Sequence, residues 1–385
     1  MFERGGVYRG EIKERTILPL LSGVTYGAYG AGAKPAICGS RENYSDAQFW
    51  NRTDTKNIWI CQAKLQNDVG VIVFNHGEKV GIKRLKVSED LETNLAELKA
   101  DYEFYHDLET ATLYLYLETT PYDTFFDIEL CEESYLVLGV SDSHDITIDN
   151  LCIKYGGGHA VRFHPGAKNI VITNCEMGYL GGSLQQGTIR YGNAIEFWNG
   201  CSDVLIENNW IYQIYDAGIT HQGGDGGDYV QQNIILRKNL IEYCCYSLEF
   251  WAGNPKKDLL KDILYEDNII RFTGYGWGKL RSSMFGVGAI NTWGHTETFK
   301  AENFVIRNNI FDMSSKSLIV QYYKEKPNVT YIGNSYYLQE GNVAFWTGKM
   351  LLTAIDQKSM EESVAKVDEQ PKEVKFIERK EETNL

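Results

Sequence analysis

The sequence predicts an all-β fold, a single-stranded right-handed parallel β-helix with loop insertions on one face. Three observations support this prediction. Short β-prone segments recur along the chain, an asparagine recurs at a fixed place within them, and glycine is abundant, with 37 residues among 385. Long stretches with the 3.6-residue periodicity of helices are scarce, and glycine-rich turns punctuate the chain instead. Internal repeats of this kind are typical of solenoids.

The first strand of the repeat begins with Asp or Asn and continues through β-prone residues to an Asn, which another apolar run follows. Successive copies start about 24 to about 41 residues apart, a variation that a solenoid accommodates as loops between constant strands. The seven copies are residues 145–153, 169–177, 203–211, 233–241, 262–270, 303–311 and 328–336.

The recurring asparagines predict a ladder of stacked side-chain amides, hydrogen-bonded from each coil to the next. Such a ladder requires parallel strands about 4.8 Å apart along the axis of the helix. The column contains Asn209, Asn239, Asn268, Asn309 and Asn334, while Asn150 and Asn174 lie one position earlier in their coils.

A second strand follows most copies of the first, at residues 160–164, 194–198, 218–222, 247–251, 289–293 and 317–321. Side chains alternate along a strand, so inward-pointing Ile195 and Phe197 place Glu196 and Trp198 on the outside. The predicted outward column is Arg162, Glu196, Thr220, Glu249, Asn291 and Ile319. Its neighbour is His164, Trp198, Gln222, Trp251, Trp293 and Gln321.

The longest insertions flank this polar and aromatic face, at residues 178–192, 223–232 and 274–288. Gly-rich loops on one side of a rigid solenoid form a cleft, and functional residues concentrate on such loops. The sequence therefore predicts the functional site on this face.

The two ends of the chain are less regular than the middle. We predict one β-helix domain over 1–350, with clear coils over 145–346 and less regular coils over 24–143. Residues 107–118 predict a hairpin excursion with its turn around 109–111. Residues 351–385 are rich in Lys and Glu, which predicts a charged tail or a peripheral helix.

Composition excludes some function classes. The net charge of −14 argues against a nucleic-acid partner, and no stretch has the apolar length of a membrane span. Eight Cys without a disulfide or zinc spacing predict reduced, buried thiols. The start lacks the apolar core of a signal peptide, so the chain as it stands predicts a cytoplasmic protein, or a secreted one if upstream residues are missing. Oligomeric state stays open.

Residues 26–40, 190–198 and 214–222 resemble bacterial right-handed parallel β-helix repeat proteins of the pectin-lyase-like superfamily. The resemblance covers roughly residues 5–350, and it implies activity on a poly- or oligosaccharide, by hydrolysis or by elimination. The Asp-rich and Gly-His-Gly signatures of polygalacturonase-like hydrolases are missing, as is the acidic calcium cluster of pectate lyases. Neither family transfers residue by residue.

Three carboxylates are candidate acid, base or nucleophile residues. Glu196 and Glu249 lie in one outward column two coils apart, which separates their backbones by about 9–10 Å. Inverting glycosidases hold their two carboxyl groups about 6.5–9.5 Å apart around a water molecule. Asp216 precedes the intervening strand and offers a closer partner for Glu196, as in retaining enzymes. The alternatives are outward carboxylates paired with arginine and, for Asp216, a turn residue.

A fourth catalytic candidate is His221. Simple alternation places it inside with Phe197 and Phe250, so a catalytic role requires a β-bulge at the neighbouring glycines. The exposed indoles suit the apolar faces of sugar rings. The predicted substrate-binding residues are Arg162, Trp198, Gln222, Trp251, Asn291 and Trp293.

No organic cofactor is implied. Asp225 and Asp228 supply only two carboxylates for calcium, so a solvated turn is the favoured interpretation there. His159 and His164 fall on opposite faces of a strand, which argues against zinc.

Three functions therefore stay open, with glycoside hydrolysis favoured. A polysaccharide lyase would need a base and a cation beside a uronate, for which Arg162, Arg190 and Lys154 are available. A glycan-binding module without catalysis would need only the tryptophan-lined face.

Overall fold

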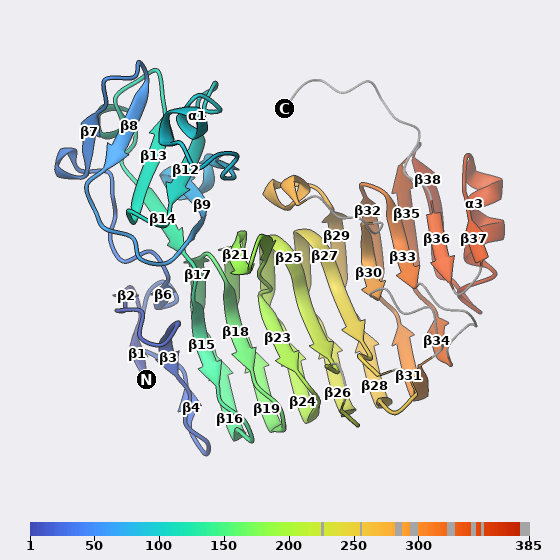
Figure 1. Cartoon of the computed structure of the whole chain (residues 1–385). Coiled ribbons are helices and arrows are strands. Elements are labelled where there is room, and N and C mark those ends of the chain that lie inside the picture. The colour runs from blue at the N-terminus through green and yellow to red at the C-terminus, as the bar shows by residue number, and fades with distance from the viewer. Residues whose placement is uncertain are drawn as a thin grey trace.

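A computed structural model describes residues 1–224, 227–254, 256–281, 287–292, 299–321, 328–339, 344–347 and 350–377. The predicted site residue Trp293 and the calcium candidate Asp225 lie outside these ranges. The chain is mostly β-strand, and its strands stack as successive coils along one axis (Figure 1). Each coil contributes strands to three columns, here called A, B and C.

Column A is a fully parallel sheet in which each strand pairs with its equivalent in the next coil. It corresponds to the first strand of the predicted repeat. Its strands are β4 (Thr25–Tyr26), β16 (His144–Asp149), β19 (Ala167–Thr173), β24 (Cys201–Glu207), β26 (Val230–Arg237), β28 (Leu259–Glu266), β31 (Lys300–Arg307) and β34 (Val329–Ile332).

Columns B and C follow column A within each coil and are also parallel. Column B contains β2 (Val7–Arg9), β6 (Ala36–Cys38), β17 (Cys152–Gly156), β20 (Glu176–Leu180), the first halves of β25 (Trp210–Gln222) and β27 (Leu240–Trp251), β29 (Ile269–Thr273), β32 (Ile310–Ser314), β35 (Ser335–Gln339) and β38 (Glu373–Ile377). Column C contains β3 (Thr16–Pro19), β15 (Tyr135–Gly139), β18 (His159–Phe163), β23 (Ile195–Trp198), the second halves of β25 and β27, β30 (Gly288–Thr292), β33 (Ser317–Gln321) and β36 (Ala344–Thr347).

The inward residues of the three columns form one continuous apolar core. Like residues stack on like: the rings of Phe163 and Phe197 are parallel, with centroids 4.9 Å apart. In column C, Phe197 pairs in register with His221, and His221 with Phe250. This stacking fixes which residues of each strand point outward, because a slip by one residue would expose the whole apolar set.

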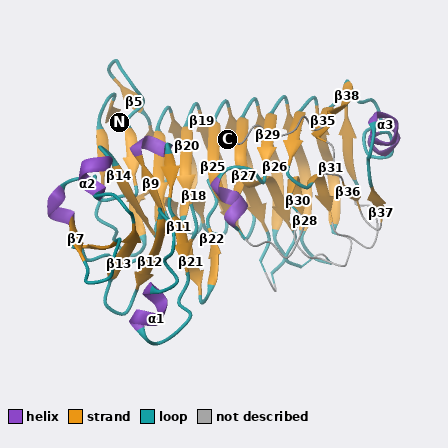
Figure 2. Cartoon of the chain, turned by 90° about the horizontal axis from the view of Figure 1, so that it is seen from above, coloured by secondary structure: helices purple, strands orange, loops and turns teal. Residues whose placement is uncertain are grey.

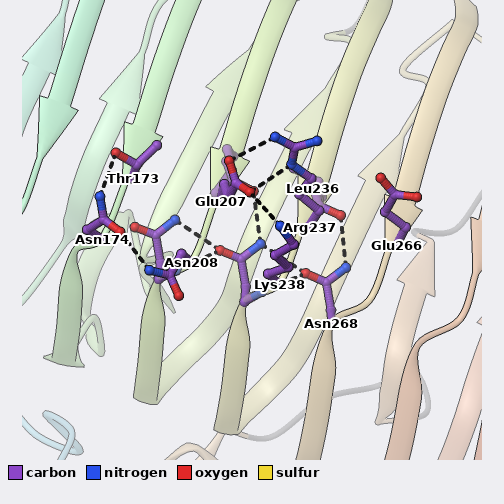
Figure 3. Close-up of polar contacts among 12 residues, drawn as sticks. Thr173, Asn174, Glu207, Asn208, Leu236, Arg237, Lys238, Glu266 and Asn268 are labelled. Atoms are coloured by element: carbon purple, nitrogen blue, oxygen red, sulfur yellow. Dashed lines mark hydrogen bonds and ion pairs between the residues drawn. The ribbon is translucent and has the colours of Figure 1, made fainter.

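The predicted asparagine ladder is confirmed (Figure 3). The side-chain oxygen of Asn239 accepts hydrogen bonds from the backbone and side-chain nitrogens of Asn209, both at 3.0 Å. The same pair of bonds links Asn239 to Asn268 and continues to Asn309 and Asn334. Buried amides thereby satisfy the backbone at the turn between columns A and B.

The sequence predicted less regular coils over 24–143. Residues 41–133 instead form a compact N-terminal unit beside the coils (Figure 1). Two sheets, β10-β9-β14 and β11-β12-β13-β8-β7, are antiparallel except for the β11–β12 pair. The turn expected around 109–111 joins β12 and β13, so the hairpin spans 103–116 and not 107–118. The elements of the N-terminal unit are η1 (Ala47–Phe49), β7 (Trp50–Arg52), β8 (Ile58–Cys61), β9 (Val69–Phe74), η2 (Asn75–Gly77), β10 (Lys79–Val80), β11 (Ile82–Arg84), α1 (Leu91–Leu95), β12 (Glu103–Asp107), β13 (Thr112–Tyr116), α2 (Pro121–Thr124) and β14 (Ile128–Glu132).

This unit has its own core, in which Phe74, Phe104 and Leu130 are fully buried. Alternating apolar residues on short strands are compatible with coils and with an antiparallel sheet, so the local pattern could not separate the two. Ahead of the unit, the short strands β1 (Phe2–Glu3) and β5 (Ala28–Tyr29) pair with each other at the first coil.

Over residues 350–377 the C-terminal segment forms strands and a helix, and the helix is one of the two alternatives that the sequence left open. Strand β37 (Met350–Leu352) is followed by α3 (Gln357–Val364). Asp356 is the N-cap of this helix and forms a capping box with it. Met360 and Val364 are fully buried against the core, and β38 adds a last strand to column B. Figure 2 shows α3 at the opposite end of the stack from the N-terminal unit. The apolar positions of α3 cover a coil end that would otherwise face water.

The eight cysteines all lie within the described residues and are buried with free thiols, as the sequence predicted. Among the described helices, none has the length and apolar character needed to cross a bilayer.

Candidate active site

The floor of the candidate site is the outward face of column C. Strand register pairs Arg162 with Glu196, Glu196 with Thr220, Thr220 with Glu249, and Glu249 with Asn291. The predicted outward column is therefore correct over these five coils. Glu196 and Glu249 are two strands apart, which places their backbones about 9–10 Å from each other.

Two insertions form walls beside this floor. One is the hairpin β21 (Ser183–Gln186) and β22 (Ile189–Tyr191), and the other is the turn η3 (Trp277–Leu280) with Arg281 after it. Together with the floor they enclose a pocket of about 470 Å³. The pocket is lined by Arg162, Gln186, Ile189, Tyr191, Asn193, Glu196, Trp198, Asp216, Gln222, Glu249, Trp251 and Arg281.

Glu196 is buried in a charged environment. Its Oε2 lies 2.9 Å from Nδ1 of His159 and 3.3 Å from Nη1 of Arg162. Burial by itself would raise the pKa of Glu196, but His159 and Arg162 outweigh it and lower the pKa to about 2. Burial also lowers the pKa of His159, whose Nε2 lies 3.2 Å from Arg162. Glu196 is consequently a fixed negative charge in the pocket.

Glu249 has different surroundings. Its Oε2 accepts hydrogen bonds from the Thr220 hydroxyl at 2.8 Å and from the Gln222 amide at 2.7 Å. Gln222 also donates to Thr220, so the three side chains form one network on two adjacent strands. Neutral hydrogen-bond donors orient this carboxyl group within the pocket.

Asp216 forms an ion pair with Arg281 inside the pocket. The register of β25 shifts between Ile214 and Ala217, and Asp216 lies within this irregularity. Burial lowers the pKa of Arg281 to about 10, which still leaves it charged at neutral pH. Asp216, a predicted catalytic candidate with a turn residue as the alternative, thus lines the pocket at the boundary between columns B and C.

The indoles of Trp198 and Trp251 lie together in the pocket, with ring centroids 5.7 Å apart. Gln222 lies between them in the strand register, and the Arg162 guanidinium lies 5.9 Å from the Trp198 ring centroid. Both indoles are partly exposed. An aromatic and polar surface of this kind offers stacking and hydrogen bonds to a ligand.

The prediction of His221 as a catalytic residue is wrong, because its side chain does not reach the pocket. Its ring points into the core, where Nδ1 lies 2.5 Å from the Gln231 amide oxygen and Nε2 lies 2.5 Å from the Tyr265 hydroxyl. Burial lowers its pKa to about 4, so it is neutral at physiological pH. The bulge that would have turned His221 outward does not occur, because residues 219–222 pair in continuous register with β27.

Other predicted residues lie at the edge of the site or away from it. Asn291 is buried beside Glu249 on β30 but does not line the pocket. Val320, not Ile319, pairs with Asn291, because the stacking of Ile319 on Ile290 shifts the alignment by one residue. Lys154 lies on column B over the ring of Tyr155, away from the pocket.

No metal site appears among the described residues. Asp228 forms an exposed ion pair with Lys257 at 3.0 Å, which fits the solvated-turn interpretation. Within the described ranges, no cluster of three or more His, Cys, Asp or Glu side chains has the geometry to hold a metal ion.

Sequence reasoning missed three functional candidates: His159, Tyr191 and Arg281. His159 appeared only as a zinc candidate, yet its fully buried ring contacts Glu196 from the preceding coil. Tyr191 and Arg281 lie on insertions that the sequence predicted as cleft walls without indicating which side chains face inward. An outward Arg162 and an outward Glu196 in adjacent coils were the available signal for the charged cluster.

No protein-family model and no curated protein matches this chain. Among solved structures, the chain is similar to a complex of XylC with xylose, with TM-score 0.46 and 14% identity over 98% of this chain and 78% of that one. It is similar to a glycoside hydrolase with TM-score 0.41 and 9% identity, covering 97% and 89% of the two chains. It is also similar to the GH136 lacto-N-biosidase of Eubacterium ramulus, with TM-score 0.39 and 14% identity over 98% and 61%. All three TM-scores lie below 0.5, so the functional assignment of this chain rests on its own pocket.

Proposed function

We propose that this protein hydrolyses a glycosidic bond in a poly- or oligosaccharide, with Glu196 and Glu249 as its two carboxyl groups. The observation that carries the proposal is the convergence of Glu196, Asp216 and Glu249 with two tryptophans in one pocket of about 470 Å³. Glycosidases use paired carboxyl groups that flank the scissile bond.

In this mechanism Glu249 is the general acid. Its carboxyl proton passes to the leaving glycosidic oxygen as the bond from that oxygen to the anomeric carbon breaks. Glu196 orients a water molecule and accepts its proton as the water oxygen bonds to the anomeric carbon from the opposite face. The low pKa of Glu196 keeps it ionised until it accepts this proton, so its negative charge faces the positive charge that develops on the sugar ring. Water is the only co-reactant.

The backbone separation of two coils favours inversion over retention. Two strand spacings amount to about 9–10 Å, and inverting enzymes hold their carboxyl groups about 6.5–9.5 Å apart. Trp198 and Trp251 would stack on the apolar faces of sugar rings, with Arg162 and Gln222 as polar contacts in the same pocket. Asp216 would hydrogen-bond a sugar hydroxyl while Arg281 holds it in place.

The test is a screen of plant and microbial glycans with wild type, Glu196→Gln, Glu249→Gln and Asp216→Asn. Each Glu variant is expected to lower kcat by about 10²–10⁴-fold, the usual contribution of a positioned acid or base. Proton NMR of the first-formed product reports its anomeric configuration. Retention would instead favour Glu196 with Asp216 as the pair, and equal activity in all four proteins would remove the catalytic assignment.

A matched control is Glu242→Gln. Glu242 is a buried glutamate on the same strand as Glu249, but it faces away from the pocket and bonds Trp210 and Arg271. Its loss should affect stability without changing kcat. A decrease in kcat as large as that of Glu249→Gln would show that any buried charge on β27 matters equally.

A second function is favoured by the two guanidinium groups of Arg162 and Arg281 in the same pocket. A lyase needs such cations to neutralise a uronate carboxylate before a base removes the neighbouring proton. Elimination leaves an unsaturated sugar that absorbs in the ultraviolet, whereas hydrolysis does not. Binding without any cleavage would identify the third alternative, a glycan-binding module.

The proposal includes a right-handed winding of a single β-helix and membership of the pectin-lyase-like superfamily. Parallel strands joined by crossover connections are right-handed in about 98% of cases, which supports the handedness. The parallel columns and the asparagine ladder support the assignment to a β-helix.

A further inference from the structure

The N-terminal unit contacts the coils at the base of the β21–β22 hairpin. Both views place β21 beside this unit (Figures 1 and 2). Three residues of the hairpin line the pocket: Gln186 and Ile189, which flank its turn, and Tyr191, which pairs with Ser183 at its base. The hairpin is therefore both a wall of the candidate active site and the place where the N-terminal unit, which contains no catalytic candidate, contacts the coils.

A buried carboxylate makes the principal contact. Oδ2 of Asp68, in the N-terminal unit, accepts a hydrogen bond of 2.6 Å from the backbone N–H of Leu184 on β21. Oδ1 of Asp68 forms an ion pair with buried Lys83, and His106 lies 3.6 Å away. Burial would raise the pKa of Asp68, but Lys83 and His106 lower it. A charged acceptor thus faces the hairpin backbone, and such bonds are among the stronger ones in proteins.

Close backbone packing reinforces this contact. A Cβ atom at Gly70 would collide with the carbonyl oxygen of Gly181 and the amide nitrogen of Ser183. Gly182 has a φ of 85° and lies against the Trp277 ring, where a side chain would not fit. Arg190 donates to the carbonyl oxygens of Gly182 at 2.5 Å and Gly70 at 3.2 Å.

The same packing reaches the opposite wall. Trp277 is the first residue of η3. Its indole N–H donates a hydrogen bond of 2.8 Å to the Gln213 carbonyl oxygen, and its ring centroid lies 4.9 Å from that of Tyr215. Val71 and Val73 of β9 belong to the same apolar cluster as Trp277 and Tyr215. Arg281, which pairs with Asp216, follows directly after η3. Both pocket walls consequently contact the N-terminal unit, the hairpin through Asp68 and Gly70 and η3 through the apolar cluster of Trp277.

We propose that the N-terminal unit is a buttress that fixes the hairpin wall of the substrate pocket, with Asp68 and Gly70 as its positioning residues. The effect on substrate recognition rests on the proposed function, whereas the effect on the hairpin does not. The unit acts through the hairpin and does not itself contact the reacting atoms.

The experiment compares Asp68→Ala with Asp68→Asn in the full chain. Alanine removes the acceptor for the Leu184 N–H, while asparagine keeps a carbonyl oxygen there. Hydrogen exchange of residues 183–191, without substrate, should accelerate by about tenfold or more in Asp68→Ala and recover substantially in Asp68→Asn. On a cleaved glycan, KM should rise in Asp68→Ala by a larger factor than kcat falls, since Glu196 and Glu249 keep their own partners.

Arg84→Ala is the control, because it removes an ion pair with Glu103 inside the same unit and away from the hairpin. It should leave the exchange of residues 183–191 unchanged.

Unchanged exchange in Asp68→Ala, or equal acceleration in strands of column A, would overturn the proposal. If Asp68→Ala does not fold, Gly70→Ala tests the same contact from the backbone side by the same criteria. If wild type cleaves no glycan, the proposed function fails while the exchange result still decides the buttress.

Discussion

Glu196 shows how one buried residue acquires a charge that its sequence context does not reveal. Carboxylates in apolar surroundings ordinarily resist ionisation, and desolvation is the largest single influence on Glu196 as well. The combined effect of His159 and Arg162 is larger and has the opposite sign. The cluster therefore contributes to folding as well as to the pocket.

This cluster predicts a particular acid sensitivity. The pKa of Glu196 falls from 4.5 to about 2 on folding, so its contribution is complete above about pH 4.5 and disappears as pH falls toward 2. The unfolding free energy of wild type should drop by about 3 kcal/mol more than that of Glu196→Gln across this interval. Urea denaturation at several pH values measures the difference. Parallel decreases in the two proteins would contradict it.

The turn between columns A and B is the element that repeats most strictly. Each ladder asparagine occupies the place where one strand ends and the next begins, and it accepts from the backbone of the preceding coil. The residue just before it adopts a left-handed conformation, with φ of 57° at Asn208 and 54° at Lys238. The ladder is thus part of the mechanism that holds successive coils in register.

We expect Asn239→Ala to reduce the unfolding free energy by about 3 kcal/mol, because two buried donors of Asn209 lose their acceptor at about 1–3 kcal/mol each. Asn208→Gly is the matched control. It removes an exposed bond to Asn174 while keeping a residue suited to a positive φ, so it should cost under about 1 kcal/mol. Chemical denaturation followed by circular dichroism compares the two; similar losses would show that the ladder is not special.

At the scale of the whole molecule, the C-terminal segment closes the stack. Asp368 is buried and takes the place of the next ladder asparagine: its Oδ2 accepts from Asn334 through the backbone at 3.0 Å and the side chain at 2.8 Å. The Tyr336 hydroxyl and the Gly333 N–H also donate to Asp368. Solenoids need such caps because each coil is stabilised by its neighbours.

Asp368→Ala should therefore destabilise the C-terminal coils first. The loss of several buried acceptor contacts is expected to cost about 3 kcal/mol or more. Hydrogen exchange should accelerate most in β34 and β35, less in β28, and least in β19. Asp368→Asn should recover part of the protection. Uniform acceleration along the whole stack would indicate global destabilisation and would contradict a capping role.

Much of the molecule could be predicted from the sequence because its parallel strand columns are built from local repeats. The strand period and the asparagine column set the register, and the register determines that Glu196, Glu249, Trp198 and Trp251 point outward. The same alternation places His221 in the core, which is where its ring lies. Its catalytic assignment was wrong because it required a bulge that breaks this alternation.

Contacts between distant segments were decided only by the tertiary structure. The partners His159 for Glu196 and Arg281 for Asp216 come from other coils and loops, and no repeat specifies them. The antiparallel N-terminal unit and the docking of Asp68 on the hairpin likewise depend on long-range packing. Strand periodicity specifies which face a residue occupies, whereas the packing of insertions determines which side chains meet there.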